Sequence, residues 1–283
     1  MSRENGSSGV SATVLLVPHI ITTVNVNGVR AAARKGLLEW LEGSQADVVC
    51  LQETRASDKQ LHETLAPALD AGWHLASAEP SAKGRNGVAV LSRRAADAVR
   101  IGFGDDEFAD AGRYIEADFD TLTVGSLYLP TGEAETPKQE QKERFMASFA
   151  AHLNRSAESS AAAGREVLVC GDWNIAHTER DIKNWKGNVK KSGFLPGERA
   201  WVDALLTDGA WVDVVRTLHP EVDGPYSWWS YRGKAFDTDA GWRIDYHLTT
   251  PGLAERAKEA RVERAATYAE RWSDHAPVTV QFR

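Results

Sequence analysis

The stretch EVLVCGDWN at residues 166–174 is the segment from which the fold can be inferred. It begins with a mainly apolar, β-branched run that predicts a buried strand, and Asp172 and Asn174 follow this strand directly. Polar side chains at the end of a buried strand are held by a rigid sheet, where binding and catalytic groups are commonly placed. The stretch therefore predicts one part of a site built at the edge of a sheet.

Three other segments repeat this arrangement. The strand-like run at 47–51 is followed by Glu53, RIDY at 243–246 contains Asp245, and SDH at 273–275 precedes a strand that resumes after Pro277. Carboxylate, amide and imidazole groups at the ends of widely separated strands predict one site assembled by a sheet. Their chemistry indicates metal-assisted cleavage of a phosphate ester.

Hydrophobic periodicity predicts a β-α-β start followed by mostly antiparallel strands. Helices are predicted at about 31–42, after Gly132 and near 198–206, and the polar stretch 156–164 is predicted to be a loop. For the second helix, Thr136 is the expected N-cap, Pro137 the first residue and Gln139 the capping-box partner. The predicted strands cover residues 20–26, 47–51, 87–91, 99–103, 114–118, 122–129, 166–170, 226–229, 243–249 and 278–282.

These elements form two halves rich in strands and helices, with no Pro/Gly linker between them. The order predicts an α/β (α+β) fold in which two packed, mostly antiparallel sheets are flanked by helices. We predict that residues 19–283 form one domain. Residues 1–18 open with the polar, Gly/Ser-rich MSRENGSSGVS and are predicted to be a disordered tail.

Composition sets limits on the class of protein. With 283 residues, 42% apolar and 26% charged, the chain has ample core material. Cys50 and Cys170 lie in apolar runs and are predicted to be buried free thiols. No apolar run reaches the roughly 18–20 residues of a membrane span, and no signal peptide is recognised. We therefore expect a cytoplasmic monomer with no membrane partner.

The charge distribution bears on the partner. A net charge of −7 argues weakly against nucleic acid, but carboxylates gathered in a catalytic site contribute to that charge. The run RDIKNWKGNVKK at 180–191 holds five basic residues and one acid, with Trp185 among them. Such a run is either solvated surface or a phosphate-binding segment, and its composition alone leaves both interpretations open.

Hydrolysis of a phosphodiester needs a cation to neutralise the phosphate, an aligned water and help for the departing oxygen. Carboxylate and amide oxygens suit Mg²⁺, so Glu53, Asp274 and Asn25 are candidate ligands. Each polar residue also has a simpler explanation, such as a strand-end acid or a turn residue. Asp172 is the candidate base, Asn174 would hold water or phosphate, and Tyr128 is either a donor or a packing residue. His275 is a candidate donor, and Asp245 is either its partner or an ion-pair partner of Arg243.

The ordered set NVNGVR, LQE, YLPTGE, GDWNIAH, GWRIDYHL and SDHAP resembles the exonuclease III family of DNA repair nucleases. That family belongs to the wider endonuclease/exonuclease/phosphatase superfamily, and the match runs from about residue 22 to 283. The segments NWKGN and SGFLPGERAW between these motifs strengthen the resemblance.

The resemblance implies a four-layer α/β sandwich that depends on Mg²⁺, for which Mn²⁺ can substitute. It implies cleavage of duplex DNA on the 5′ side of abasic sites, removal of 3′-blocking groups and 3′→5′ exonuclease activity. By position, Glu53 is implied as the main metal ligand, with Asn25 and Asp274 nearby. The implied catalytic groups are Asp172 with Asn174, Tyr128, and His275 with Asp245.

The resemblance also implies the DNA contacts. Arg30, Asn184 and Asn188 match residues that contact DNA near the lesion, which favours a phosphate-binding role for the basic run and its Lys186. Trp228, Trp242 and Ile244 match the wall of the pocket that receives the flipped-out abasic sugar. Thr131 and Asn86 depart from the family pattern; Thr131 stands where many members carry Asn or Gln, so a weaker DNA contact is expected there.

Two alternatives remain at this point. A superfamily phosphodiesterase or phosphatase acting on phosphoinositides, sphingomyelin or RNA would share the Glu, Asp and His set, but should lack the NWKGN segment and the tryptophan-lined pocket. A catalytically silent nucleic-acid binder should have lost active-site groups, yet all the candidates named above are present. The sequence therefore favours the DNA repair nuclease.

Overall fold

The computed structural model describes residues 19–207 and 209–283, which form two six-stranded sheets. The predicted tail at 1–18 lies outside the described residues. Strands β1 (Ile20–Asn25) and β2 (Val48–Gln52) pair in parallel, as do β7 (Leu122–Tyr128) and β8 (Glu166–Asp172). Every other strand pair of the described residues is antiparallel, which confirms the predicted sheet type. The first sheet has the order β11 (Ala257–Val262), β12 (Val278–Phe282), β1 (Ile20–Asn25), β2 (Val48–Gln52), β4 (Val88–Ser92) and β3 (His74–Ala78). The second has the order β5 (Ala98–Ile101), β6 (Tyr114–Phe119), β7 (Leu122–Tyr128), β8 (Glu166–Asp172), β10 (Asp245–Thr249) and β9 (Val212–Asp213).

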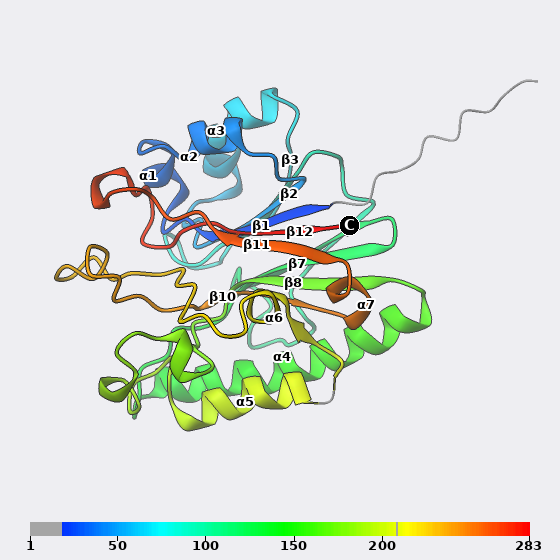
Figure 1. Ribbon diagram of the computed structural model, residues 1–283. Coiled ribbons are helices and arrows are strands. Elements are labelled where there is room, and N and C mark those ends of the chain that lie inside the picture. The colour runs from blue at the N-terminus through cyan, green and yellow to red at the C-terminus, as the bar shows by residue number, and fades with distance from the viewer. Residues whose placement is uncertain (1–18, 208) are drawn as a thin grey trace, which may run out of the picture.

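The two sheets pack face to face and each is covered by helices on its outer side (Figure 1). Residues such as Val48, Val124 and Leu168 fill the layer between the sheets. The outer face of the first sheet packs on α1 (Val29–Ala33), α2 (Leu37–Gly43) and α3 (Asp58–Asp70), and that of the second on α4 (Pro137–Ala162) and α5 (Pro196–Thr207). The predicted four-layer sandwich is thus confirmed. Short elements complete the chain: α6 (Val214–Leu218), α7 (Pro251–Ala254), η1 (Glu179–Asp181), η2 (Trp185–Gly187) and η3 (Tyr268–Glu270).

Several predicted elements were wrong in their extent. The helix predicted at 31–42 is two helices, because Gly36 takes a positive φ of 125° between them. The loop predicted at 156–164 continues α4 to Ala162, since its alanines favour helix, and Gly164 at φ 63° follows the helix end. Helix α3 with its complete Ser57 capping box was not predicted, nor were β3 and β11.

Two local predictions were also wrong. Thr136 does cap α4, but it accepts from the backbone N–H of Lys138, and the Gln139 side chain donates instead to Glu198. Residues 226–229 form no strand, and Trp228 makes only isolated bridges to Trp242 and His275. Residues 226–229 therefore do not follow the strand pattern of their local sequence, because Trp228 pairs with residues distant in the chain.

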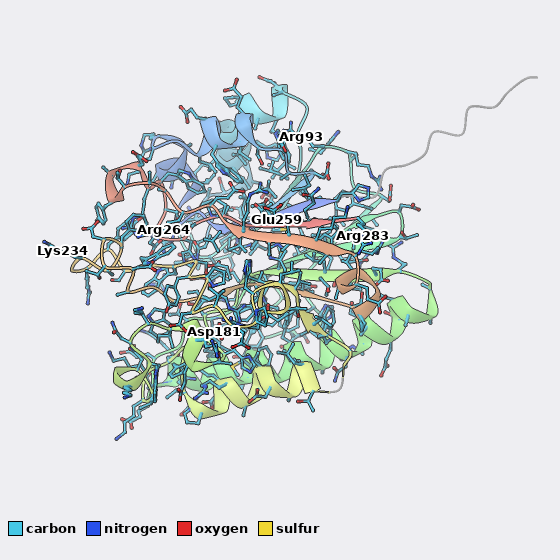
Figure 2. All side chains as sticks on the ribbon, in the orientation of Figure 1. Arg93, Asp181, Lys234, Glu259, Arg264 and Arg283 are labelled. Atoms are coloured by element: carbon cyan, nitrogen blue, oxygen red, sulfur yellow. The ribbon has the colours of Figure 1, made fainter. Side chains whose placement is uncertain are left out.

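The structure also bears on the two cysteines and on membrane spans. Cys50 and Cys170 are buried free thiols, as predicted. Within the two described ranges, none of the helices combines the length and apolarity needed to cross a membrane. Charged side chains cover the outside, such as the exposed Arg93 and Lys234, whereas Asp181 lies inside the molecule (Figure 2).

Candidate active site

Three candidate residues meet because their strands end in register. Tyr128 on β7 lies opposite Asp172 on β8, and Asp172 lies opposite Asp245 on β10. Asp172 and Asp245 are buried almost completely, and Tyr128 is buried beside them. The second sheet therefore places a phenol and two carboxylates in one row, as the strand-end pattern predicted.

The first sheet supplies the opposite side of the site. The Asn25 side chain at the end of β1 donates to Glu53 Oε1 at 2.8 Å and to Asp172 Oδ2 at 2.9 Å, so one amide links carboxylates of both sheets. Its amide oxygen accepts the backbone N–H of Asn27 at 2.9 Å. Asn25 therefore positions the two carboxylates in this structure, and its role as a metal ligand stays a prediction.

His275 is held between two carboxylates. Its Nδ1 lies 2.9 Å from Asp245 Oδ2, and its Nε2 lies 3.7 Å from Asp172 Oδ2. Ser227 fixes Asp245 further, because its hydroxyl donates to the same Oδ2 at 2.5 Å. The structure thus brings His275 and its predicted partner together.

The simpler explanation for Asp245, an ion pair with Arg243, is wrong. Arg243 Nε lies 2.6 Å from Asp181 and its Nη2 lies 2.8 Å from Asp213. Arg243 precedes β10, which begins at Asp245, and its charge is paired with these two other acids. Asp245 is therefore the partner of His275, as described above.

Burial and charge shift the pKa values of this group. Burial raises the pKa of Asp172 to about 7, although the positive charge of His275 opposes the shift. Burial alone would lower the pKa of His275, but the charges of Asp245 and Asp172 outweigh it and raise that pKa to about 10. Near neutral pH the site therefore holds a charged imidazole beside a carboxylate that can take up a proton.

Two further carboxylates offer oxygen ligands for a cation. Glu53 and Asp274 line the same cavity and are partly exposed to it. Asn27 donates to Asp274 Oδ1 at 2.8 Å and Trp228 Nε1 donates to Oδ2 at 3.1 Å, while Arg55 Nε donates to Glu53 Oε2 at 2.8 Å. This set of hard oxygen atoms fits Mg²⁺, which binds through one or two carboxylates and keeps several waters.

Asp172, Asp245 and His275 form another group that could hold a metal, with atoms within 4.8 Å of one another. We interpret this group as a charged imidazole between two carboxylates, because His275 Nδ1 is hydrogen-bonded to Asp245 and a protonated imidazole cannot be a ligand. Glu53 and Asp274 are the better fit for a hard cation.

Asn174 and Tyr128 complete the predicted catalytic set. Asn174 has a left-handed backbone with φ 51°, and its N–H donates to Asp172 Oδ1 at 2.9 Å while its amide donates to the Leu129 carbonyl at 2.9 Å. Burial and the charges of Glu53 and Asp172 raise the pKa of Tyr128 well above its usual range. Tyr128 therefore stays protonated and can act as a hydrogen-bond donor.

A cavity of about 220 Å³ opens onto these groups. One side is apolar, where the rings of Trp228 and Trp242 meet edge to face at 5.9 Å and Ile244 lies beside them. The other side is polar. The lining consists of Glu53, Thr131, Asp172, Asn174, Ser192, Gly193, Trp228, Trp242, Ile244, Asp274 and His275.

The basic run starts beside this cavity. Ile182 packs against Ile244 and pairs with Trp242, and Trp185 packs on the same small cluster. The exposed Lys186 ammonium lies 5.5 Å from the centre of the Trp185 ring. Beyond the cavity, Asn188 donates to the Asn184 carbonyl at 2.8 Å, and Arg30 is exposed on α1.

The two departures from the family pattern occupy different places. Thr131 lines the cavity, whereas Asn86 takes a left-handed backbone with φ 49° and accepts the backbone N–H of Arg55 at 2.9 Å. Asn86 therefore supports the segment that follows Glu53. Its side chain donates to the Ala111 carbonyl at 3.0 Å, which ties that segment to the neighbouring loop.

Sequence reasoning missed several residues of the site. Arg55 and Asn27 hold the two candidate ligands, and Ser227 holds Asp245. Arg113 lies 4.8 Å over the ring of Tyr128 and donates to its carbonyl at 3.1 Å. Asn27 had a local signal in the turn sequence NVNG, and Arg55 lies only two residues after Glu53, whereas Ser227 and Arg113 reach their partners from segments farther along the chain.

The fold and this constellation define a hydrolase of phosphodiesters. The pattern of the Endonuclease/Exonuclease/phosphatase family matches residues 22–275, and the chain belongs to this family. It is 35% identical over 258 residues to an exodeoxyribonuclease of Bacillus subtilis, covering 90% of this chain and 95% of that protein. It is 31% identical over 260 residues to the DNA repair nuclease APEX1 of Danio rerio, covering 92% and 81%.

Solved structures give the same relationship. A 3′ phosphatase from Neisseria, determined with a product DNA hairpin, superposes with a TM-score of 0.84 at 30% identity. The superposition covers 94% of this chain and 99% of that one. The shared architecture thus extends over almost the whole described chain.

Proposed function

We propose that this protein is a Mg²⁺-dependent DNA repair nuclease that cuts duplex DNA on the 5′ side of abasic sites. The observation that carries the proposal is the cavity of about 220 Å³, whose apolar wall faces the Asp172 and His275 pair. We also propose removal of 3′-blocking groups and 3′→5′ digestion, because both break a phosphodiester or phosphate ester next to a 3′ end. Mn²⁺ is expected to substitute for Mg²⁺ at the same oxygen ligands.

The residues divide the chemistry among them. Mg²⁺ held by Glu53 and Asp274 would neutralise phosphate charge and polarise the phosphoryl oxygen. Asp172, with a pKa of about 7, takes the proton of the attacking water, and Asn174 holds that water or the phosphate. The charged His275 donates a hydrogen bond to a phosphoryl oxygen, and Tyr128 donates to the developing charge.

The cavity supports the choice of substrate. A flipped-out sugar without a base can enter a small pocket lined by Trp228, Trp242 and Ile244, whereas a normal nucleotide is larger and costs a few kcal/mol to unstack. Lys186, Asn184, Asn188 and Arg30 are proposed to contact the flanking phosphates and sugars. Together these contacts favour duplex DNA with an abasic site or a 3′ end as the partner.

The rival within the family is a phosphodiesterase or phosphatase of lipid headgroups or RNA. Turnover of an abasic duplex, an undamaged duplex, sphingomyelin and an inositol phosphate should be compared at equal substrate concentration with Mg²⁺. We expect the abasic duplex to have the highest kcat/KM. A preference for a headgroup substrate would overturn the DNA repair assignment.

Three broader expectations belong to the same proposal. Strand β12 near the C-terminus lies between β11 and β1, which supports residues 19–283 as one domain. A monomeric state and a cytoplasmic location remain predictions from the sequence.

A further inference from the structure

A buried ion pair lies directly behind the polar wall of the cavity. Lys142 of α4 and Glu198 of α5 are 0% and 1% exposed, and Nζ lies 2.7 Å from Oε1. Burying two charges is costly, and their mutual attraction offsets that cost only when further hydrogen bonds satisfy both groups. The partners of this pair therefore show what it holds in place.

The ammonium of Lys142 contacts three separate segments of the chain. It donates to the Asn174 carbonyl at 2.9 Å, to the Thr131 carbonyl at 3.3 Å and to Ser192 Oγ at 3.5 Å. All three residues line the cavity. The buried ammonium of Lys142 therefore holds three segments of the chain around the cavity.

Glu198 fastens the same wall from the other side. Its Oε2 accepts the backbone N–H groups of Gly193 at 2.7 Å and Leu195 at 3.0 Å, and its Oε1 accepts the hydroxyl of Ser192 at 3.1 Å. The Ser192 hydroxyl also lies 2.7 Å from the Thr131 carbonyl. The pair and Ser192 form one closed network behind the cavity.

The backbone makes room for this network. Gly132 takes a φ of 73°, and a Cβ there would lie 2.8 Å from Lys142 Cδ and 2.5 Å from Ser192 Oγ. A side chain at this position would therefore displace both groups. The positive φ of Asn174 is a second strained feature, and its carbonyl is the one that Lys142 holds at 2.9 Å.

We propose that Lys142 and Glu198 are positioning residues for the nuclease reaction. They fix the left-handed conformation of Asn174, whose N–H in turn holds Asp172, and they set the width of the cavity between Ser192 and Trp242. This inference rests on the proposed function, since it concerns the same cavity. Neither residue touches the reacting atoms, so their effect reaches the chemistry through Asn174 and the loop at Ser192.

The test uses the double variant Lys142→Met, Glu198→Gln. Methionine keeps the buried stem but donates nothing, and glutamine keeps an acceptor for the N–H groups of Gly193 and Leu195. Wild-type activity on an abasic duplex is measured first, because its absence would refute the proposed function and not this inference. We expect kcat of the double variant to fall by roughly 10- to 100-fold, as small misplacements of catalytic groups do, with KM changed less than threefold.

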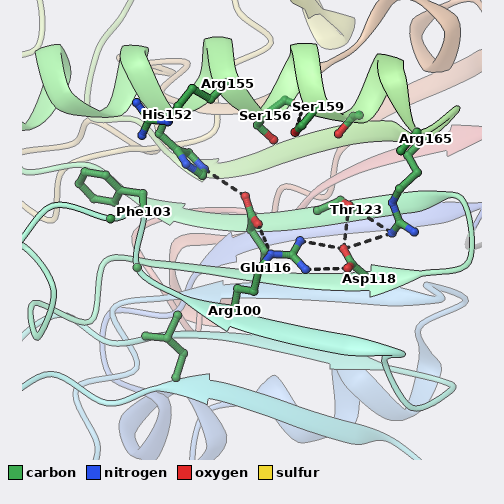
Figure 3. Close-up of a pocket in the computed structure, with 15 residues that line it drawn as sticks. Arg100, Phe103, Glu116, Asp118, Thr123, His152, Arg155, Ser156, Ser159 and Arg165 are labelled. Atoms are coloured by element: carbon green, nitrogen blue, oxygen red, sulfur yellow. Dashed lines mark hydrogen bonds and ion pairs between the residues drawn. The ribbon is translucent and has the colours of Figure 1, made fainter.

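A matched control comes from a buried acid of strand β6 that contacts the same helix, α4. Glu116 is a buried carboxylate that lies 3.0 Å from His152 Nε2 on α4 and 2.9 Å from Arg100 Nε, in a groove that shares no lining residue with the cavity (Figure 3). Glu116→Gln should lower the melting temperature while leaving kcat within twofold of wild type. That outcome would show that loss of a buried charge pair alone does not account for the loss of turnover in the double variant.

Ser192→Ala is the milder variant, and it tests the positioning role of the ion pair if the double variant does not fold. It removes the link to Thr131 while leaving the ion pair in place, and we expect a roughly three- to tenfold lower kcat. Wild-type kcat in the folded double variant, or in Ser192→Ala if only that protein folds, would overturn the inference. A drop in kcat beyond that of Glu116→Gln at matched melting temperature would support it.

Discussion

Two hollows of this protein differ in how their acidic side chains are paired, and the larger hollow is the one in which the charges are balanced. The larger, of about 650 Å³, lies between α4 and the strands β5 and β6, and the candidate site occupies a smaller one of about 220 Å³ (Figure 3). In the larger hollow the acids are matched with cations: Arg100 pairs with Glu116 and Asp118, and Arg165 pairs with Asp118. In the smaller one, the acids outnumber their partners.

The pKa values record this difference. Burial alone would raise the pKa of Glu116, but hydrogen bonds from His152 and Tyr114 and the charge of Arg100 bring it below its usual value. In the active-site cavity, burial raises the pKa of Asp172 to about 7. A hollow lined by matched charges stabilises the fold, whereas one with an excess of buried acid is prepared for a cation and a proton.

The largest expected effect is on turnover, and we expect it for a substitution in the smaller hollow but not for one in the larger. Asp172→Asn removes the base but keeps the shape, so we expect kcat on an abasic duplex to fall by about 10²–10⁴-fold or more, while the Kd for DNA changes little. Glu116→Gln, in the larger hollow, should leave kcat within twofold. If DNA binding disappears together with turnover in Asp172→Asn, Asp172 is a structural residue.

The next effect concerns the cation. Glu53→Ala removes a carboxylate ligand, so we expect the Mg²⁺ concentration for half-maximal activity to rise by about 10- to 100-fold. The measurement is a Mg²⁺ titration of initial rates, with Glu116→Gln titrated in parallel as the control. An unchanged midpoint for Glu53→Ala would show that the cation is held elsewhere.

Stability should change in opposite directions in the two hollows. Asp172 has a folded pKa of about 7, above the roughly 3.9 of the unfolded chain, so its ionisation costs stability as the pH rises through that interval. In EDTA, Asp172→Asn should therefore melt higher than wild type at pH 7.5. This advantage should shrink to near zero as the pH falls to the unfolded pKa of about 3.9, below which Asp172 is protonated in both states.

Glu116 has the opposite sign, because its folded pKa is lowered. Its charge contributes stability above the unfolded pKa of about 4.3, and this contribution is lost as the pH falls through the folded value. Glu116→Gln should accordingly lower the free energy of unfolding at pH 7 by about 1–3 kcal/mol. Urea denaturation of the three proteins at pH 7.5 and 4 checks both signs, and equal shifts of both variants in one direction would break the comparison.

The smallest effect lies outside both hollows. Lys186→Ala should weaken DNA binding regardless of sequence and reduce the slope of log Kd against log salt by about one unit, as expected for one lost phosphate contact. Lys138 provides the control, since it is a comparably exposed lysine paired with Glu133 at 2.8 Å. A salt slope that is the same in Lys186→Ala and wild type would make the basic run ordinary solvated surface.

The sequence predicted the part of this site that depends on strands. Tyr128 and Asp172 lie at the ends of clear apolar runs and Asp245 lies at the start of its strand, and parallel or antiparallel pairing then brings them into register. The alternative partner of Asp245 was excluded only by the structure, which places Arg243 with Asp181. Strand periodicity gives the face of a residue but not its neighbour across the sheet.

The remainder depends on long-range contacts that leave no local pattern. The amide of Asn25 could have offered either its oxygen or its nitrogen, and contacts with Asn27, Glu53 and Asp172 decide which. Lys142 lies in an amphipathic helix where a lysine predicts exposure, yet it is fully buried because Glu198 meets it from another helix. Residues 226–229 read as a strand but pair only through isolated bridges.

The most direct test of the account is a cleavage map of a labelled duplex with one central abasic-site analogue, incubated with Mg²⁺ or with excess EDTA beside an undamaged duplex. We expect a single Mg²⁺-dependent cut on the 5′ side of the lesion, with a ladder from the undamaged duplex measuring the exonuclease activity of the protein. Absence of a cut at the lesion with either Mg²⁺ or Mn²⁺ would contradict it. Binding to the same duplex without cleavage would then identify a silent DNA-binding relative.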